Sequence, residues 1–194
     1  MNSSEFYKLI INDFPFEPTL KQNIVLQQLA DYIIDTSPNT LYVLKGFAGT
    51  GKTTIIGTIV KNLWKAKKSA VLMAPTGRAA KVISNYSGKE AFTIHKKIYT
   101  ARYSKSGKVS FVLAPNKHKK TIFIVDEASM ISDIPSQSSL FGSGSLLDDL
   151  MQYVYSGHQC KLLLIGDTAQ LPPVKLDISP ALNENALSLS YNKE

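Results

Sequence analysis

The residues with the clearest chemical meaning form a glycine-rich loop between two apolar segments. The loop reads Gly46-Phe47-Ala48-Gly49-Thr50-Gly51-Lys52-Thr53 and fits the P-loop pattern G-x-x-x-x-G-K-[ST]. Its glycines let backbone N–H groups converge on phosphate oxygens, and a following helix would direct its positive end there. We expect Lys52 to reach the β and γ phosphates, as a catalytic group, and the Thr53 hydroxyl to hold Mg²⁺. The nucleotide-binding residues predicted here are Gly46, Ala48, Gly49, Thr50, Gly51, Lys52, Thr53 and Thr54.

Two adjacent acids follow an apolar run further along the chain. Residues 121–125 are expected to form a strand that ends at Asp126 and Glu127. Asp126 suits Mg²⁺ coordination, and Glu127 suits polarisation of the attacking water. This pair favours a hydrolase over a nucleotide kinase, which would need a second substrate pocket. The two motifs together predict a P-loop ATPase that uses ATP and Mg²⁺.

The elements that must position these residues alternate along the chain. Helices are expected at 18–36, 52–65, 79–86 and 145–155, and strands at 41–44, 70–73, 121–125 and 161–165. This alternation predicts an α/β fold with a parallel sheet covered by helices on both faces, and with ligand-binding groups at the strand ends. Residues 109–113 would form one arm of a β-hairpin turning at 104–107, and residues 134–145 a loop.

Length and composition limit the class of protein. The 194 residues suit one domain with a small insertion. No apolar run approaches the ~18 residues that span a membrane, and the N-terminus lacks a signal-peptide pattern, so we expect a cytoplasmic protein without membrane contact. A single cysteine, Cys160, excludes an internal disulfide, and its apolar neighbours predict a buried thiol. The histidines show no metal-ligand spacing.

The positive charge is concentrated in one stretch. Eight of the 22 basic residues lie between Lys96 and Lys120, with no acidic residue among them, whereas the rest of the chain is close to neutral. The same stretch carries Tyr99, Tyr103 and Phe111. Basic and aromatic side chains together suit a nucleic-acid strand, with lysines for phosphates and rings for bases. The alternative is a solvated loop without a ligand.

Five segments resemble motifs of superfamily 1 helicases of the RecD and Dda type, and they occur in the same order. Together they span residues 18–174, and they are more specific than the P-loop alone. The Q motif is resembled by Pro18-Thr19-Leu20-Lys21-Gln22, motif Ia by Ala74-Pro75-Thr76-Gly77-Arg78-Ala79-Ala80, and a short RecD-like motif by Thr93-Ile94-His95. Motif II is resembled by Asp126-Glu127-Ala128-Ser129-Met130, and motif III by Gly166-Asp167-Thr168-Ala169-Gln170-Leu171-Pro172-Pro173-Val174.

The resemblance implies roles for individual side chains. Gln22 would read the adenine edge, although it also suits an exposed helix position. Gln170 would sense the γ-phosphate and couple it to DNA binding, as a catalytic residue. Arg78 would touch DNA phosphates or pair with a local acid, and His95 would support the DNA-facing loops or be structural. The implied nucleic-acid contacts are Pro75, Thr76, Arg78, Thr93 and His95.

The resemblance also predicts how the domain is organised and what accompanies it. Residues 1–98 and 121–194 would form a RecA-like motor domain, and residues 99–120 an inserted pin beside single-stranded DNA, with Phe111 either stacking on a base or facing the core. A second RecA-like domain with a γ-phosphate arginine would belong to the same longer chain, of which this is a fragment. The resemblance implies 5′-to-3′ translocation, and the RecD type adds the possibility of nuclease subunits. The competing hypothesis is an ATP-dependent switch or adaptor module without translocation.

Overall fold

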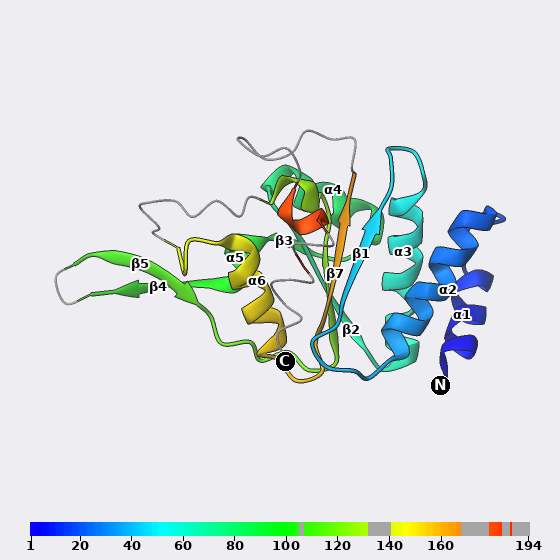
Figure 1. The fold of residues 1–194 in the computed structure, drawn as a ribbon, viewed down its shortest axis with the longest axis horizontal. Coiled ribbons are helices and arrows are strands. Elements are labelled where there is room, and N and C mark those ends of the chain that lie inside the picture. The colour runs from blue at the N-terminus through cyan, green and yellow to red at the C-terminus, as the bar shows by residue number, and fades with distance from the viewer. Residues whose placement is uncertain (105–106, 132–140, 168–178, 184–186, 188–194) are drawn as a thin grey trace.

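The computed structural model describes residues 1–104, 107–131, 141–167, 179–183 and Leu187. Its centre is a five-stranded sheet of order β1-β7-β6-β2-β3 (Figure 1), in which every neighbouring pair of strands is parallel. All five carboxyl ends therefore lie at one edge of the sheet. The strands are β1 (Leu41–Lys45), β2 (Ser69–Ala74), β3 (Ala91–Thr93), β6 (Thr121–Val125) and β7 (Lys161–Gly166).

The central strands β2, β6 and β7 are apolar after their first residue, because both faces of the sheet are covered. Successive side chains of β6 alternate between two hydrophobic clusters, with Phe123 and Val125 in one and Ile122 and Ile124 in the other. The cluster with Phe123 lies under α5 (Ile94–Ile98) and α6 (Leu146–Tyr155). The cluster with Ile122 lies under α1 (Ser3–Asn12), α2 (Leu20–Ile34), α3 (Lys52–Asn62) and α4 (Gly77–Ser87). The predicted α/β fold with a two-sided parallel sheet is confirmed.

Short 3-10 turns complete the described elements. One extends α3 at Leu63–Ala66, a second follows β6 at Ala128–Met130, and a third lies at Pro180–Leu182. Cys160 is buried, as predicted, and burial raises the pKa of its thiol. Among the described residues, no helix combines the length and the apolar character that crossing a membrane requires.

The sequence analysis missed three elements. It assigned no structure to the first 17 residues, where α1 begins with a capping box: the Asn2 side chain accepts the Glu5 N–H, and the Glu5 side chain accepts the Asn2 N–H. Phe6 and Ile10 of α1 are fully buried. It also missed β3 and α5, which are only three and five residues long and offer too little periodicity to detect.

An antiparallel hairpin projects from one side of the molecule (Figure 1). It consists of β4 (Tyr99–Tyr103) and β5 (Val109–Leu113), with Ala101 opposite Phe111. The predicted hairpin arm at 109–113 is therefore confirmed. Of the predicted loop at 134–145, only residues 141–145 are described, and they form turns before α6.

Candidate functional site

The carboxyl edge of the sheet collects the predicted motifs from five separate parts of the chain. At this edge β1 leads into the P-loop, and β7 ends at Gly166 and is followed by Asp167. Next in space, β6 is followed by Asp126 and Glu127, and β2 by Pro75 and Thr76. The last strand, β3, ends at Thr93 and is followed by Ile94 and His95. Neighbouring strands are ~4.8 Å apart, so two strand spacings, about 10 Å, separate β1 from β6. That span brings the P-loop and the two acids to the same region of the edge.

The P-loop has the backbone that its glycines predict. Gly49 and Gly51 have φ values of 78° and 88°, in the left-handed region that favours glycine, and Gly51 caps the start of α3. The Gly46 N–H donates to the Gly166 carbonyl at 3.2 Å, which fixes the loop to β7. A Cβ atom at Gly46 would lie 2.9 Å from the Thr50 hydroxyl oxygen. A side chain at position 46 would therefore collide with Thr50, and α3 begins directly after the loop at Lys52, the arrangement by which helix N-termini bind anions.

The Lys52 ammonium lies over this loop. Its Nζ donates to the Gly46 carbonyl and, at 2.8 Å, to the Phe47 carbonyl. These carbonyls belong to the loop that a phosphate would occupy, so exchanging them for phosphate oxygens needs only a side-chain movement. Thr53 is exposed in the first turn of α3, where its hydroxyl is accessible.

Gln22 lies against the P-loop at the start of α2. Its Nε2 donates to the Thr50 carbonyl at 3.1 Å, and its Oε1 accepts the Thr19 N–H at 3.0 Å in a capping box. Both ends of the amide are therefore engaged with the backbone. The structure brings Gln22 to the nucleotide loop, while recognition of the adenine edge stays a prediction.

Asp126 and Glu127 directly follow β6. One Asp126 oxygen accepts the Glu127 N–H at 2.9 Å and the other accepts the Tyr86 hydroxyl at 2.8 Å. Glu127 has a φ of 56°, which is uncommon for a residue with a side chain and turns the chain sharply after the strand. Carboxylate and hydroxyl oxygens such as those of Asp126 and Thr53 are the ligands that Mg²⁺ prefers, so the donor set fits that metal.

Tyr86 is a site residue that the sequence analysis missed. It belongs to α4 and lies half-buried, 40 positions before Asp126. Burial, followed by the Asp126 carboxylate, raises the pKa of its hydroxyl far above the usual value, so the group is a neutral donor. No sequence pattern could have indicated this contact, because a tyrosine near a helix end is ordinarily a packing residue.

The turn after β2 and the acids after β6 share one cavity of about 320 Å³. Thr76 caps α4 by accepting the Ala79 N–H at 3.2 Å, and Arg78 is exposed in the first turn of that helix. The cavity is lined by Thr76, Arg78, Val82, Asp126, Glu127 and Met130, among others. Two motifs predicted to serve DNA and ATP thus border the same space.

Thr93 and His95 lie further along the same edge, beside the hairpin. Thr93 caps α5 by accepting the Lys96 N–H at 3.2 Å. The His95 ring meets the edge of Phe141 at a centroid distance of 5.1 Å and tilts toward Tyr99 at 5.7 Å. Burial lowers the pKa of His95, which favours the neutral ring.

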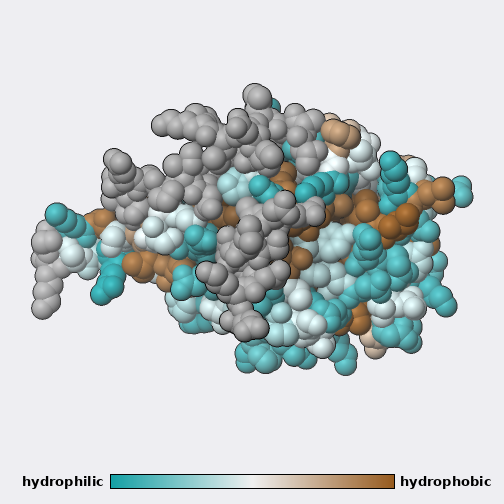
Figure 2. Space-filling view, in the orientation of Figure 1, coloured by the Kyte–Doolittle hydropathy of each residue, from teal (hydrophilic) through white to brown (hydrophobic). Residues whose placement is uncertain are grey.

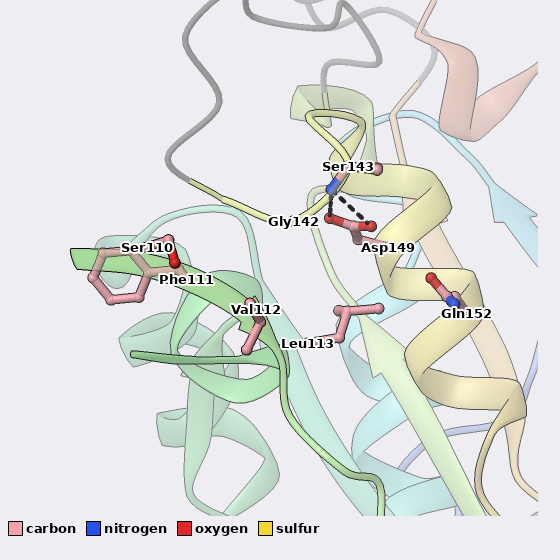
Figure 3. A pocket seen from close by; sticks show the side chains of 8 residues that line it. All are labelled: Ser110, Phe111, Val112, Leu113, Gly142, Ser143, Asp149 and Gln152. Carbon is pink, nitrogen blue, oxygen red and sulfur yellow. Dashed lines mark hydrogen bonds between the residues drawn. The ribbon is translucent and has the colours of Figure 1, made fainter. Parts of the chain in front are cut away.

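We use the term hairpin base for the cluster that attaches the hairpin to the domain, formed by His95, Tyr99, Phe111, Phe141 and Asp149. Phe111 stacks on Phe141 with centroids 4.5 Å apart and planes 14° from parallel. The Tyr99 hydroxyl donates to Asp149 at 2.6 Å. The Ser143 N–H also donates to Asp149, at 3.0 Å (Figure 3), and Asp149 is only 2% exposed.

The basic stretch is spread over separate places, and its first two lysines, Lys96 and Lys97, lie on α5. Arg102 and Lys108 are exposed on the hairpin with Tyr103, whose side chain is 75% exposed; in Figure 2 this projection carries hydrophilic and hydrophobic groups together. Lys119 and Lys120 instead precede β6 at the amino edge, where the Lys120 N–H donates to the His158 carbonyl at 2.8 Å. Lys105 and Gln170 lie outside the described residues, as does motif III after Asp167.

The fold and the carboxyl edge define a class: a RecA-like P-loop domain with an inserted hairpin. A family model described as an AAA domain matches residues 30–176, and the chain belongs to that family. Within it, the chain is a motor domain of the RecD and Dda type of superfamily 1 helicase.

Three curated relatives illustrate this membership. The ATP-dependent RecD2 DNA helicase of Deinococcus radiodurans is 33% identical over 154 residues, which are 79% of this chain and 18% of the relative. The ATP-dependent DNA helicase dda of Enterobacteria phage T4 is 33% identical over 135 residues, 68% of this chain and 28% of the relative. The RecBCD enzyme subunit RecD of Buchnera aphidicola (subsp. Schizaphis graminum) is 34% identical over 174 residues, 77% and 25% respectively. The chain thus spans less than a third of each of these relatives.

Proposed function

We propose that this chain is the first motor domain of an ATP-dependent DNA helicase and binds Mg²⁺ and ATP at the carboxyl edge of its sheet. The observation that carries the proposal is the arrangement of the P-loop, the start of motif III, motif II, motif Ia and the Thr93–His95 motif along that edge, with the P-loop hydrogen-bonded to β7. In the longer protein, ATP hydrolysis would drive translocation along single-stranded DNA. The 5′-to-3′ direction follows the resemblance to the RecD and Dda type.

The side chains of the edge divide the chemistry between them. Lys52 would exchange the Gly46 and Phe47 carbonyls for the β and γ phosphates. Thr53 and Asp126 would hold Mg²⁺, which neutralises charge on the phosphates when bound. Glu127 would polarise the attacking water, Gln170 would sense the γ-phosphate, and Gln22 would contact the adenine.

DNA would lie across the neighbouring part of the same edge. The Thr76 hydroxyl and the exposed Arg78 guanidinium offer phosphate contacts, with Pro75 beside them and with Thr93 and His95 next along the edge. Residues 99–120 would be the pin, in which the exposed ring of Tyr103 offers a stacking surface and Arg102 and Lys108 offer charge.

Turnover would depend on a second RecA-like domain elsewhere in the longer protein. An arginine that reaches the γ-phosphate raises phosphoryl-transfer rates by ~10³–10⁵, and in this family type it comes from that domain. We therefore expect this chain to bind ATP and to hydrolyse it slowly. Nuclease subunits would be additional partners if the longer protein works as RecD does.

The test measures binding of ATP with Mg²⁺, and of a single-stranded oligonucleotide, to the chain and to its Lys52→Ala and Glu127→Gln variants. We expect micromolar nucleotide affinity that is lost in Lys52→Ala and kept in Glu127→Gln. A matched control is Lys61→Ala, an exposed lysine on α3, which should bind normally. Absence of nucleotide binding by the unaltered chain would contradict the proposal.

The DNA arm of the test compares two double variants. Neutralising Arg102 and Lys108 should weaken DNA binding and reduce the slope of log affinity against log salt by ~0.7 per lost phosphate contact. Neutralising Lys119 and Lys120 at the amino edge should change neither. Nucleotide binding without DNA affinity at low salt would instead favour the ATP-dependent switch module.

A further inference from the structure

Helix α4 connects the turn proposed to bind DNA with the carboxylate proposed to bind Mg²⁺. Its first turn holds Arg78 and is capped by Thr76, and its last turn holds Tyr86. Eight residues separate Arg78 from Tyr86, which is ~12 Å along a helix at 1.5 Å per residue. Ala80 and Ile83 are buried between these ends, and the helix is continuous from Gly77 to Ser87, so it links the two ends as a single element.

The distal end of α4 touches Asp126 through one hydrogen bond. The Tyr86 hydroxyl donates to Oδ2 of Asp126 at 2.8 Å, while Oδ1 accepts the Glu127 N–H at 2.9 Å. With one donor on each oxygen, the orientation of the carboxylate plane is set. Each oxygen keeps a second lone pair, so a metal ion or its water can still be accepted.

The proximal end of α4 borders the same cavity as the acids. Thr76, Arg78 and Val82 line one side of it, and Asp126 and Glu127 line another. A strand bound at the start of α4 would therefore press on a helix that faces the acids along one side and bonds to Asp126 at its end.

We propose that α4 couples DNA binding to metal and nucleotide binding, with Tyr86 as the positioning residue that transmits the coupling to Asp126. The inference rests on the proposed function and adds a residue outside the five motifs. DNA contact at Thr76 and Arg78 shifts α4, the Tyr86 hydroxyl moves with it, and the Asp126 carboxylate turns toward or away from the geometry that Mg²⁺ requires. Neither a covalent step nor a change in protonation is involved.

Thermodynamic linkage makes the proposal quantitative. If single-stranded DNA changes the affinity for ATP with Mg²⁺ by some factor, the nucleotide must change the affinity for DNA by the same factor. A Tyr86→Phe variant removes only the hydroxyl, so it should bring both factors toward 1 by equal amounts. It should also raise the Mg²⁺ concentration needed for half-maximal nucleotide binding by about 10- to 100-fold, the usual effect of removing a hydrogen-bond partner of a metal ligand.

The experiment titrates a fluorescent ATP analogue with and without single-stranded DNA, and labelled DNA with and without ATP, at a series of Mg²⁺ concentrations. It uses the unaltered chain, Tyr86→Phe and a matched control, Tyr155→Phe. Tyr155 is also half-buried, and its hydroxyl donates to the Thr40 carbonyl at 3.1 Å, remote from Asp126. Melting temperatures measured alongside show that all three proteins are folded.

The outcomes separate the inference from the function on which it rests. Loss of coupling together with a higher half-maximal Mg²⁺ concentration in Tyr86→Phe, and neither change in Tyr155→Phe, would support the inference. If the unaltered chain binds both ligands without mutual influence, or if Tyr86→Phe keeps the coupling and Mg²⁺ dependence of the unaltered chain, the inference is overturned while the proposed function stands. If the unaltered chain binds neither ligand, the proposed function fails and the inference fails with it.

Discussion

Two aspartates in this domain have nearly the same partners and different surroundings. Asp126 accepts a tyrosine hydroxyl at 2.8 Å and a backbone N–H at 2.9 Å, and Asp149 accepts a tyrosine hydroxyl at 2.6 Å and a backbone N–H at 3.0 Å. Asp126 is half-buried beside a cavity at the sheet edge, whereas Asp149 is 2% exposed beneath the hairpin. The same kinds of donor therefore leave one carboxylate beside a cavity, where we propose that it binds Mg²⁺, and bury the other in the framework.

The largest effect on stability should come from Asp149→Ala. The change leaves the Tyr99 hydroxyl and the Ser143 N–H without their acceptor in a partly buried place, at a cost of ~2–4 kcal/mol in the free energy of unfolding. For a domain of this size we expect the melting temperature to fall by ~5–15 °C.

The control is Asp148→Ala, the exposed neighbour on α6. It should cost less than ~1 kcal/mol, the range of a charge near a helix start. Equal melting temperatures for the two variants would show that the hairpin base contributes no special stability.

In contrast to Asp149→Ala, Asp126→Asn should impair metal and nucleotide binding and leave the stability of the domain nearly unchanged. We expect the Mg²⁺ requirement for nucleotide binding to rise by at least ~10²-fold, because even residues that only support a metal ligand contribute 10- to 100-fold to metal affinity. The melting temperature without ligand should change little, since the amide keeps one acceptor oxygen at a half-buried position. Calorimetric titration with Mg²⁺ and ADP, together with thermal melting, checks both halves. A large loss of stability would place Asp126 with Asp149 as a framework residue.

Substitutions of the two aromatic residues of the hairpin, Tyr103 and Phe111, should affect different properties of the domain. Tyr103→Ala should weaken binding of single-stranded DNA by ~1–2 kcal/mol, the usual range for one base stacked on a ring, with no change in melting temperature. Phe111→Ala should lower the melting temperature by a few degrees, about 1–2 kcal/mol, because Phe111 stacks on Phe141. Oligonucleotide anisotropy and thermal melting measure the pair. The reverse pattern would restore Phe111 as the base-stacking residue.

The smallest expected effect is the pH dependence at His95. Burial lowers the pKa of His95 in the folded state, so the unfolded chain binds its proton first as the pH falls below ~6.5. The unfolded state then holds more protons, and stability is lost on acidification. His118, whose pKa burial also lowers, contributes with the same sign.

Melting temperatures between pH 7.5 and 5.5 measure this effect, and we expect the His95→Gln variant to have the shallower decline, by about one to two degrees. A steeper decline in that variant would mean that protonated His95 gains a partner in the hairpin base.

The P-loop and the strands before it and before Asp126 were predictable because their signals are local. Gly46 through Thr53 specify their own backbone, and the apolar runs 41–44 and 121–125 predict strands, of which the second is fully buried. The hydrogen bond from the Gly46 N–H to the Gly166 carbonyl is different, because it depends on the order of the strands in space and joins residues 120 positions apart.

The hairpin base and the Tyr86 contact could not be predicted because they join distant residues. Tyr99 reaches Asp149, and Tyr86 reaches Asp126, across 50 and 40 positions. The basic stretch could not be resolved from composition, which groups Lys108 and Lys120 together. In the structure Lys108 lies on the hairpin, whereas Lys120 directly precedes β6 and therefore lies at the amino edge of the sheet. Helix α1 carries a local signal, the capping box of Asn2 and Glu5, from which its start could be predicted.

Amide hydrogen exchange with and without ATP and Mg²⁺ tests the central claim most directly, because it locates the ligand as well as detecting it. We predict added protection at the P-loop, residues 46–54, and at Asp126 and Glu127, with peptides of the hairpin base unchanged and with no added protection in Lys52→Ala. Protection confined to other parts of the chain, or none at the P-loop under saturating nucleotide, would contradict the assignment of this edge as the ATP site.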